Sequence, residues 1–209
     1  MPTPLPRLLP ASLAGLIALA LSLSPALADN TSPGAAVAMQ KAEILESRAS
    51  DAGGVQPLPS GVRLSRDGVR AVDPRGQAPL NDAVSCLARS IYWEAKGTPR
   101  GEMEAVANVV MNRLGSSRFP STLCGVVQEG SETGRCQFSW WCDGRPDEAH
   151  EMAEYATARE IARLALNGQL ADRTRGALFF HHKSITPSWA SSFIHTMQSR
   201  EFDFYRPPG

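Results

Sequence analysis

The chain has 209 residues, enough for one domain with a substantial core and some additional segments. It contains 21 basic and 21 acidic residues, so its formal net charge is zero. This balance excludes a large basic field of the kind that attracts nucleic acid or an anionic membrane. A non-ionic or mixed-charge substrate fits the charge balance better.

The N-terminus has the pattern of a secretory signal peptide. Arg7 precedes an uncharged run of mostly Leu, Ala and Ile that extends from Leu8 to Leu23. The run ends at Pro25-Ala26-Leu27-Ala28, which has the small-x-small form that signal peptidase reads. The alternative is a membrane anchor, but the run is short for a bilayer span. We therefore predict a signal peptide at 1–28, export to the periplasm and no transmembrane anchor after cleavage.

Residues 29–80 have the composition of a linker. The segment 35–49 can form one helix, but 51–79 is rich in Gly, Pro, Arg and Asp, and its apolar residues show no sustained period. We predict a flexible, linker-like lead at 29–80 and a single domain at 81–209.

From residue 81 onward the apolar residues follow helical spacing. Asn81 or Asp82 can cap a helix that extends to Ala95, and Gly97-Thr98-Pro99 stops it. The pattern further predicts a helix at 100–114, a helical turn at 119–127, a loop or hairpin at 128–145, a helix at 147–167, a strand at 177–181 and a helical turn from Pro187. These elements predict a mainly α (α+β) fold, a helical domain with a small β-hairpin or loop insert.

Four cysteines lie in this part of the chain: Cys86, Cys124, Cys136 and Cys142. An even count in an oxidising compartment indicates two disulfides, and four cysteines allow three connectivities among which the sequence does not choose. We predict Cys86–Cys124 and Cys136–Cys142. A zinc site is the alternative, but it needs close pairs such as C-x2-C, and the sequence has none.

Glu94 is the carboxylate that most resembles a catalytic group. It follows Ile91 by three residues and Leu87 by seven, so it lies on the apolar face of its helix. Apolar surroundings and the negative end of a helix both disfavour the ionised form. A carboxyl that stays protonated near neutral pH is suited to general acid catalysis. The alternative is a glutamate in the last helical turn that faces water or an arginine.

Aromatic residues gather near this helix end and in the segment after residue 135: Tyr92, Trp93, Phe138, Trp140 and Trp141. Such rings can stack on sugar faces, or they can pack in the core. Tyr92 and Trp140 are better candidates for a cleft than Trp189.

His181 and His182 form the one His-His pair in the sequence. A zinc site needs three or four ligands, and adjacent residues of a strand point to opposite faces. We therefore predict no metal and no cofactor. His181 is expected to line a cleft or donate a hydrogen bond, and His182 to lie on the surface.

A series of short motifs follows in order along 82–206: Tyr92–Gly97, Ala105–Ala107, Asn112-Arg113, Phe119-Pro120, Cys124–Val127, Cys136–Ser139, Cys142–Gly144 and Pro187–Ala190. This ordered series resembles the cell wall hydrolase and spore-cortex-lytic enzyme family. The chain departs from the family pattern at Leu178–His181, where Thr-x-Tyr-His is usual, and at Phe202, where a His is often seen.

The resemblance implies a lysozyme-like fold of the lytic transglycosylase type, acting on the MurNAc–GlcNAc bond of peptidoglycan. Glu94 matches the catalytic Glu of the family. Gln137 and Ser139 match a segment that lies in the cleft, so they are candidate sugar contacts. Asn112 and Arg113 are expected to brace the catalytic helix rather than bind the substrate.

One carboxyl suffices for this chemistry: Glu94 protonates the bridging oxygen, the sugar's 6-hydroxyl attacks, and Glu94 accepts its proton to leave a 1,6-anhydro end. A hydrolase would need a second carboxylate, for which Asp143 is the first candidate. Glu102 and Glu104 are expected to be surface charges. Two other classes stay open, a zinc amidase acting on the peptide stem and a non-catalytic wall-binding module. The expected partners are glycan strands and, as an option, a protein activator.

Overall fold

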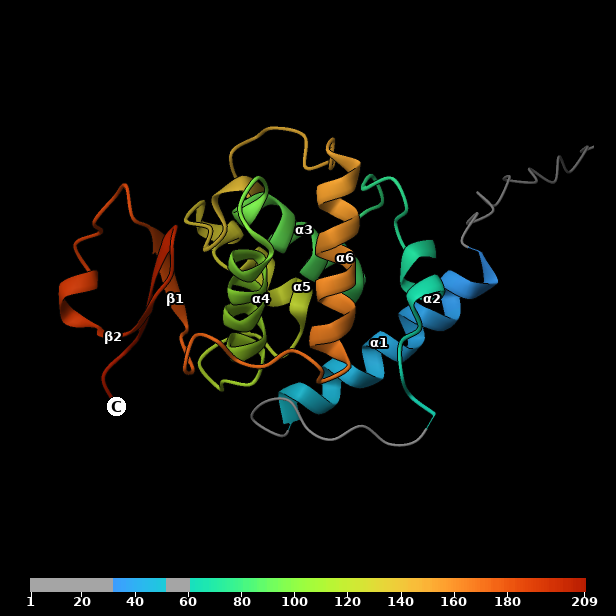
Figure 1. Ribbon diagram of the computed structural model, residues 1–209, viewed down its shortest axis with the longest axis horizontal. Coiled ribbons are helices and arrows are strands. Elements are labelled where there is room, and N and C mark those ends of the chain that lie inside the picture. Colours follow the sequence, from blue (N-terminus) through green and yellow to red (C-terminus); the bar gives the residue numbers. More distant parts are fainter. Residues whose placement is uncertain (1–31, 52–60) are drawn as a thin grey trace, which may run out of the picture. The chain divides into compact units, whose positions relative to one another are not determined.

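The structure is a computed structural model that describes residues 32–51 and 61–209. The predicted signal peptide therefore lies outside the described residues. Residues 31–209 belong to one compact unit. The α-helices of its described part are α1 (Pro33–Asp51), α2 (Arg66–Ala71), α3 (Ala83–Ala95), α4 (Arg100–Leu114), α5 (Leu123–Gln128) and α6 (Met152–Leu166) (Figure 1).

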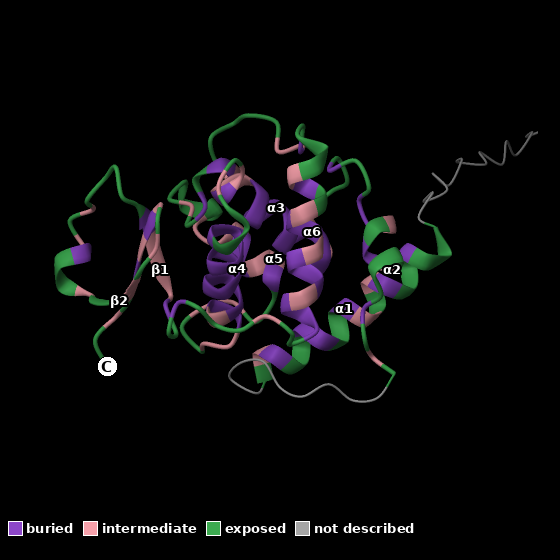
Figure 2. Ribbon diagram, in the orientation of Figure 1, coloured by how far each residue is buried: buried purple, intermediate pink, exposed green. Residues whose placement is uncertain are grey.

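Helix α3 is the central element of this unit. The side chain of Asp82 caps it by accepting hydrogen bonds from the backbone N–H groups of Val84 and Ser85, each at 3.0 Å. Every residue from Ala83 to Tyr92 is buried, and the helix contacts α1, α4, α5 and α6. Figure 2 shows the buried residues concentrated on the helices around α3. The predicted cap and the predicted helices α3 and α4 are confirmed.

The prediction of a flexible lead is wrong for α1. Its inner face carries residues spaced three or four apart that are buried against the core: Ala35, Ala38, Ala42, Leu45 and Ala49. Small side chains let the helix approach its neighbours closely. A Cβ added to Gly68 of α2, for example, would lie 3.2 Å from the Cβ of Ala38. Alanine contributes little to a hydropathy pattern, yet it is often fully buried, which is why the composition misled.

The segment from Gly61 to Leu80 is also part of the fold. Its Asp73 is buried and fully paired. Asp73 accepts hydrogen bonds from the backbone N–H groups of Gln77 at 2.7 Å and Ala78 at 2.9 Å, and from the hydroxyl of Tyr155 at 2.7 Å. The compact unit therefore includes residues that we assigned to the linker, and the predicted boundary at 81 is wrong.

The sheet has three antiparallel strands in the order β1-β3-β2 and follows α6 in the chain. The strands are β1 (Phe179–His182), β2 (Ile194–Gln198) and β3 (Phe202–Arg206). Phe180 pairs with Phe204 and His181 with Asp203, and β2 has an irregularity between His195 and Met197. The mainly helical fold with a small β part is confirmed, and β1 lies close to its predicted place.

Of the loop or hairpin predicted at 128–145, the loop is confirmed and the hairpin is wrong, because this segment holds the short 3-10 helices η1 (Ser131–Thr133) and η2 (Ser139–Trp141) instead of strands. Gly130 and Gly134 both have positive φ and turn the chain tightly there. The later helical turn, predicted from Pro187, contains the 3-10 helix η3 (Ala190–Ser192).

Glu102 and Glu104 of α4 are buried, so the prediction of surface charges is wrong for both. Glu102 accepts a hydrogen bond from the backbone N–H of Arg200 at 3.0 Å, which fixes the β2–β3 turn to α4. Glu104 forms ion pairs with Arg100 and Arg173, at 2.9 and 3.0 Å. Each carboxylate is buried because it has partners.

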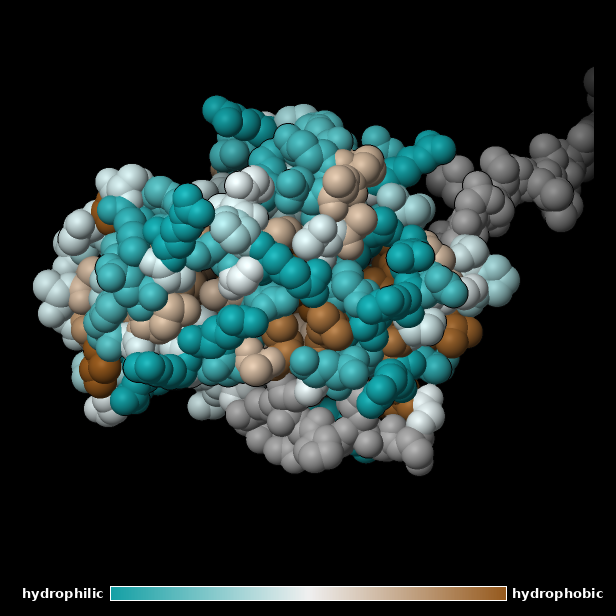
Figure 3. Space-filling model, viewed as in Figure 1, coloured by the Kyte–Doolittle hydropathy of each residue, from teal (hydrophilic) through white to brown (hydrophobic). Residues whose placement is uncertain are grey.

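The surface in the view of Figure 3 is mostly hydrophilic, with small hydrophobic groups between polar side chains. Among the described residues, no helix combines the length and apolar character that a membrane span requires.

Candidate active site

Glu94 lies in the last turn of α3, one residue before the helix ends. Its side chain is only partly exposed. Burial raises the pKa of Glu94 to about 7, although the positive charge of Arg113 acts in the opposite direction. The carboxyl is therefore near half protonation at neutral pH, where it can both give and accept a proton.

Arg113, in the last turn of α4, is 3% exposed. Its Nε donates a hydrogen bond to the carbonyl oxygen of Leu178 at 2.7 Å, and its guanidinium carbon lies 5.1 Å from the ring centres of both Phe119 and Phe138. Its Nη1 has no hydrogen-bond partner among the described residues. Burial lowers the pKa of Arg113 to about 10, while Glu129 and Glu94 act to raise it. The guanidinium thus stays charged at neutral pH.

Glu129 is the C-terminal capping residue of α5 and was not singled out in the sequence. Its Oε2 is buried and has no hydrogen-bond partner among the described residues. Burial raises the pKa of Glu129, and Arg113 lowers it. We call Glu94, Arg113 and Glu129 the charge cluster. The signal in the sequence that could have indicated Glu129 is a carboxylate at a helix end just before a Gly-rich loop.

Asp143 is exposed, and its Oδ1 accepts a hydrogen bond from the backbone N–H of Arg145 at 2.9 Å. The influences on the pKa of Glu94 are burial and Arg113, not Asp143. The structure therefore does not bring this candidate into the charge cluster.

Three of the predicted sugar-stacking rings are buried. Tyr92 and Phe138 are 0% and 1% exposed, and Trp140 is 6% exposed. The hydroxyl of Tyr92 accepts a hydrogen bond from the backbone N–H of His150 at 3.0 Å and donates one to the carboxylate of Glu151. Trp140 stacks on Trp93 with ring centres 6.5 Å apart. This burial favours the core-packing alternative for Tyr92, Phe138 and Trp140.

Gln137 and Ser139 are exposed on the loop that the Cys136–Cys142 disulfide closes. The backbone N–H of Gln137 donates to the carbonyl oxygen of Glu129 at 3.0 Å, so the loop is fixed beside the charge cluster. Both predicted disulfides are present.

Cys86–Cys124 joins α3 to α5, with Cα atoms 5.2 Å apart. This bond fixes the helix of Glu94 to the helix that Glu129 caps.

His181 is buried, and its Nε2 lies 3.1 Å from the hydroxyl oxygen of Tyr205. Its neighbour His182 is exposed, as the alternation along a strand predicted. Around His181 the sheet carries partly exposed rings, which we call the sheet aromatic cluster: Phe179, Trp189, Phe193 and Tyr205. Phe179 also lies 5.4 Å from the guanidinium carbon of Arg113. Trp189, which by sequence is a weaker cleft candidate than Tyr92 and Trp140, is the more exposed ring.

Asn112 and Arg113 fix the chain that leads into β1. The side-chain amide of Asn112 donates to the carbonyl oxygen of Ala177 at 3.1 Å, next to the bond from Arg113 to Leu178. The two residues therefore brace the C-terminal segment against α4. They were expected to brace the catalytic helix, but their hydrogen bonds go to the segment before β1 and not to α3.

Comparison with known proteins identifies the class. Residues 97–205 match the family model described as Cell Wall Hydrolase, and the match begins three residues after Glu94. The chain is 34% identical over 125 residues to the spore cortex-lytic enzyme of Bacillus subtilis (strain 168), which covers 59% of this chain and 37% of that protein. It is 35% identical over 111 residues to the spore cortex-lytic enzyme of Halalkalibacterium halodurans, with 51% of this chain and 29% of that protein covered.

The chain thus matches about a third of the length of these curated relatives. Among solved structures, the catalytic domain of the Bacillus cereus SleB protein is similar at 25% identity and a TM-score of 0.48, covering 74% of this chain and 99% of that one. Since the family model matches more than half of the chain, the protein belongs to the cell wall hydrolase family.

Proposed function

We propose that this chain is an exported enzyme that cleaves the MurNAc–GlcNAc bond of peptidoglycan glycan strands as a lytic transglycosylase. The observation that carries the proposal is the partly buried carboxyl of Glu94, whose pKa burial raises to about 7. Membership of the cell wall hydrolase family supports the choice of substrate. The signal-peptide pattern at 1–28 supports export to the periplasm.

In the proposed reaction, the protonated carboxyl of Glu94 donates its proton to the oxygen between the two sugars. The bond from that oxygen to C1 of MurNAc breaks, and the N-acetyl group of the same sugar supports the positive charge at C1. The 6-hydroxyl oxygen then bonds to C1 and gives its proton to the Glu94 carboxylate. The products are a 1,6-anhydro end and a free 4-hydroxyl, no water is consumed, and Glu94 returns to its acid form.

Arg113 has the role of a positioning residue in this scheme. Its charge limits how far burial can raise the pKa of Glu94. It also stabilises the carboxylate that exists between the two proton transfers. The buried side of Arg113 that has no hydrogen-bond partner among the described residues leaves a donor for a polar substrate group or a water molecule.

Sugar contacts are proposed for exposed groups near the charge cluster. Gln137 and Ser139 offer an amide and a hydroxyl on a loop fixed to Glu129. The rings of Phe179, Trp189 and Phe193 are partly exposed and offer apolar faces, and Phe179, which contacts the other two, lies next to Arg113. Rings of this kind are suited to the C–H faces of sugars, while Tyr92 and Phe138 support the site from within.

Hydrolysis is the second candidate, and one observation favours keeping it. Glu129 has a buried oxygen without a hydrogen-bond partner among the described residues and shares Arg113 with Glu94. A hydrolase needs a second carboxylate to activate water or to attack the sugar. Glu129 replaces Asp143 as the proposed second carboxylate in that case.

Mass spectrometry of the products from purified peptidoglycan tests the proposal. The wild-type chain is compared with Glu94→Gln, Glu129→Gln and, as a control, the exposed Glu132→Gln. We expect 1,6-anhydro ends from the wild type and Glu132→Gln, and none from Glu94→Gln. If the wild type instead produces reducing ends and Glu129→Gln does not, the chain is a hydrolase and not a lytic transglycosylase.

Failure of every form to cut glycan would contradict the proposal and leave two classes. Release of peptide stems that stops on chelation would indicate a zinc amidase. Retention on peptidoglycan without any cleavage would indicate a wall-binding module.

A further inference from the structure

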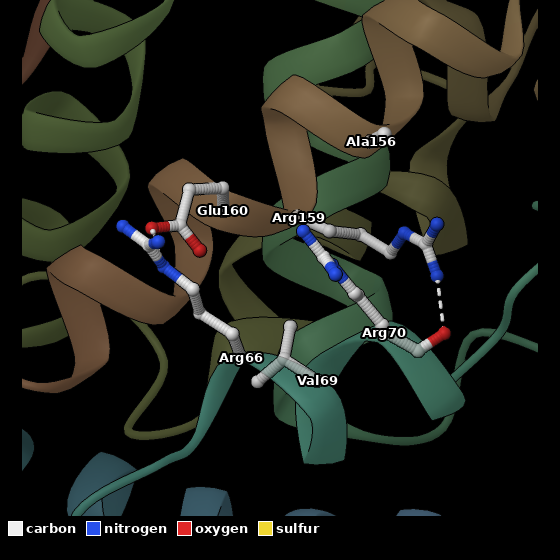
Figure 4. Close-up of a pocket in the computed structure, with 6 residues that line it drawn as sticks. All are labelled: Arg66, Val69, Arg70, Ala156, Arg159 and Glu160. Atoms are coloured by element: carbon white, nitrogen blue, oxygen red, sulfur yellow. Dashed lines mark hydrogen bonds and ion pairs between the residues drawn. The ribbon is translucent and has the colours of Figure 1, made fainter.

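A cavity of about 430 Å³ lies between α2 and α6 (Figure 4). Its lining residues come only from these two helices: Arg66, Val69, Arg70, Ala156, Arg159 and Glu160. None of these residues belongs to the charge cluster or to the sheet aromatic cluster. The volume is within the range of about 300–1,000 Å³ that small-molecule sites usually have.

The lining carries three guanidinium groups and one carboxylate. Both oxygens of that carboxylate, on Glu160, are occupied. Oε1 accepts from Arg66 at 3.2 Å and from Arg163 at 2.9 Å, and Oε2 accepts from Arg163 at 2.9 Å. Glu160 therefore has little capacity left to neutralise Arg70 and Arg159.

Arg70 points from α2 toward α6 across the cavity in Figure 4. Its ion pair with Asp67 is long, 3.9 Å, and both side chains are largely exposed. An exposed pair of this kind contributes little binding energy. The guanidinium of Arg70 is thus available to an incoming anion.

Arg159 of α6 also lines the cavity and is 8% exposed. Its Nη1 donates to the carbonyl oxygen of Arg70 at 2.7 Å, and its guanidinium carbon lies 5.1 Å from the ring centre of Tyr155. Its Nε has no hydrogen-bond partner among the described residues. The charge of Asp73 acts on Arg159, but no carboxylate of the described residues forms an ion pair with it, and a buried cation is poorly screened by water, so Arg159 adds to the positive potential of the cavity.

The rest of the wall is apolar. Val69 and Ala156 also line the cavity; Ala156 is exposed, whereas Val69 is 2% exposed. A carboxylate next to a small aliphatic group would contact both the guanidinium groups and the apolar residues of the lining. A bare phosphate would leave the apolar residues without a partner. Guanidinium groups also match the planar carboxylate in geometry.

We infer that this cavity binds the carboxylate end of a short peptide with a small aliphatic side chain. The preference for such a peptide is argued from the cavity alone. Only the origin of the peptide rests on the proposed function, because peptidoglycan strands carry short peptides that end in such groups. The site would hold a peptide stem of the polymer while the glycan is cut elsewhere on the molecule. The cavity and its charge belong to the structure whether or not glycan is cleaved.

An NMR titration of the full chain tests the inference with N-acetyl-D-alanyl-D-alanine as the probe. We expect saturable shifts of the backbone amide signals of Val69 and Ala156. The same dipeptide with an amidated C-terminus should bind about tenfold more weakly or worse, because it lacks the charge. Equal binding of the two probes, or tighter binding of inorganic phosphate than of the dipeptide, would overturn the inference.

Arg70→Gln is the informative variant, because it removes an exposed guanidinium but keeps the carbonyl that anchors Arg159. It should weaken the dipeptide about tenfold, while the exposed Arg75→Gln outside the cavity leaves binding unchanged. An Arg70→Gln chain that binds like the wild type would contradict the inference.

This titration requires no catalysis, so it is independent of the cleavage assay. Loss of glycan cleavage with intact dipeptide binding would refute the proposed reaction alone. Glycan cleavage without dipeptide binding would refute only the inference that the cavity binds a peptide carboxylate.

Discussion

Asp73 and Arg89 form a buried ion pair, with Oδ2 and Nη2 2.9 Å apart and both side chains 2% exposed. Arg89 lies on α3, five residues before Glu94, and Asp73 lies in the segment between α2 and α3. Burial alone would raise the pKa of Asp73. The hydrogen bonds from the Ala78 N–H and Tyr155, together with Arg89, outweigh it and hold the pKa below its usual value. The helix that carries the proposed acid is therefore fixed by a residue that precedes the predicted domain.

Asp73→Asn should destabilise the protein by about 3–5 kcal/mol, because it leaves the charge of Arg89 buried without a counter-ion. Since the folded pKa is lowered, the stabilisation by Asp73 is complete above its unfolded value of 3.8 and is lost as the pH falls through the lower folded value. Urea unfolding at neutral pH measures the loss. Asp67→Asn, whose side chain is 97% exposed, is the matched control and should change stability by less than about 0.5 kcal/mol.

Glu94→Gln should abolish activity and yet stabilise the fold at alkaline pH. The folded pKa of about 7 lies above the unfolded value of 4.5, so the wild type loses stability as the pH rises between these values. Above the folded pKa the loss reaches at most about 3 kcal/mol. Unfolding curves at pH 4 and pH 8 should show a gain for Glu94→Gln only at pH 8. Equal stability of the two proteins at pH 8 would contradict the raised pKa.

Arg113 should control the alkaline limit of the reaction. The rate should fall above about pH 7, where Glu94 loses its proton. Arg113→Met removes the charge that lowers the pKa of Glu94, so the alkaline limb of the pH–rate profile should move to higher pH. Arg113→Lys keeps the charge and should keep the limb in place, even if the rate itself drops. An unmoved limb in Arg113→Met would exclude this role.

The two disulfides should differ in their effect on stability. Cys86–Cys124 spans 38 positions and Cys136–Cys142 only 6. A crosslink that closes a longer loop restricts the unfolded chain more, so loss of the first should cost about 4 kcal/mol and loss of the second about 2 kcal/mol. Denaturation of the two double Cys→Ser variants measures both. The opposite order would indicate that contacts in the folded state, rather than the unfolded chain, determine the effect.

Gly76→Ala should destabilise the protein by about 2–4 kcal/mol. Gly76 has a φ of +66°, and an added Cβ would lie 2.5 Å from the Cβ of Ala149. Gly144→Ala is the control, because its φ of +74° is similar but its Cβ would meet no atom within 4 Å. That variant should cost only about 1 kcal/mol for the backbone conformation. Thermal unfolding compares the two, and equal losses would show that the close approach is relieved by a small shift.

The elements with strong local signals could be predicted from the sequence. Helix α4 has its predicted bounds, Arg100–Leu114, because Pro99 and Gly115 mark its ends, and the Asp82 cap fixes the start of α3. The partly buried position of Glu94 could be predicted because Glu94 lies on the apolar face of its helix. The pairing of the cysteines was a prediction among three possibilities.

Features that depend on contacts distant in the sequence could not be predicted in this way. The exposure of a ring is one of them: nothing in the local pattern distinguishes the buried Tyr92 from the partly exposed Trp189. The partnership of Arg113 with Glu129 also arises only when α4 and α5 pack together. Strands β2 and β3 were missed although Phe202 and Phe204 alternate, because each strand has only five residues.

One pair of hydrogen bonds has a consequence for a chain that emerges from the ribosome or a translocation pore. The side chain of Asn167 bonds to both the backbone N–H and the carbonyl oxygen of Leu64, at 2.9 and 3.0 Å and 103 positions away. Until Asn167 has been synthesised, the backbone N–H of Leu64 lacks this acceptor. Contacts between such distant positions form late and slow folding. A nascent chain that waits for them stays unfolded longer, which is the state that the proposed export across a membrane would require.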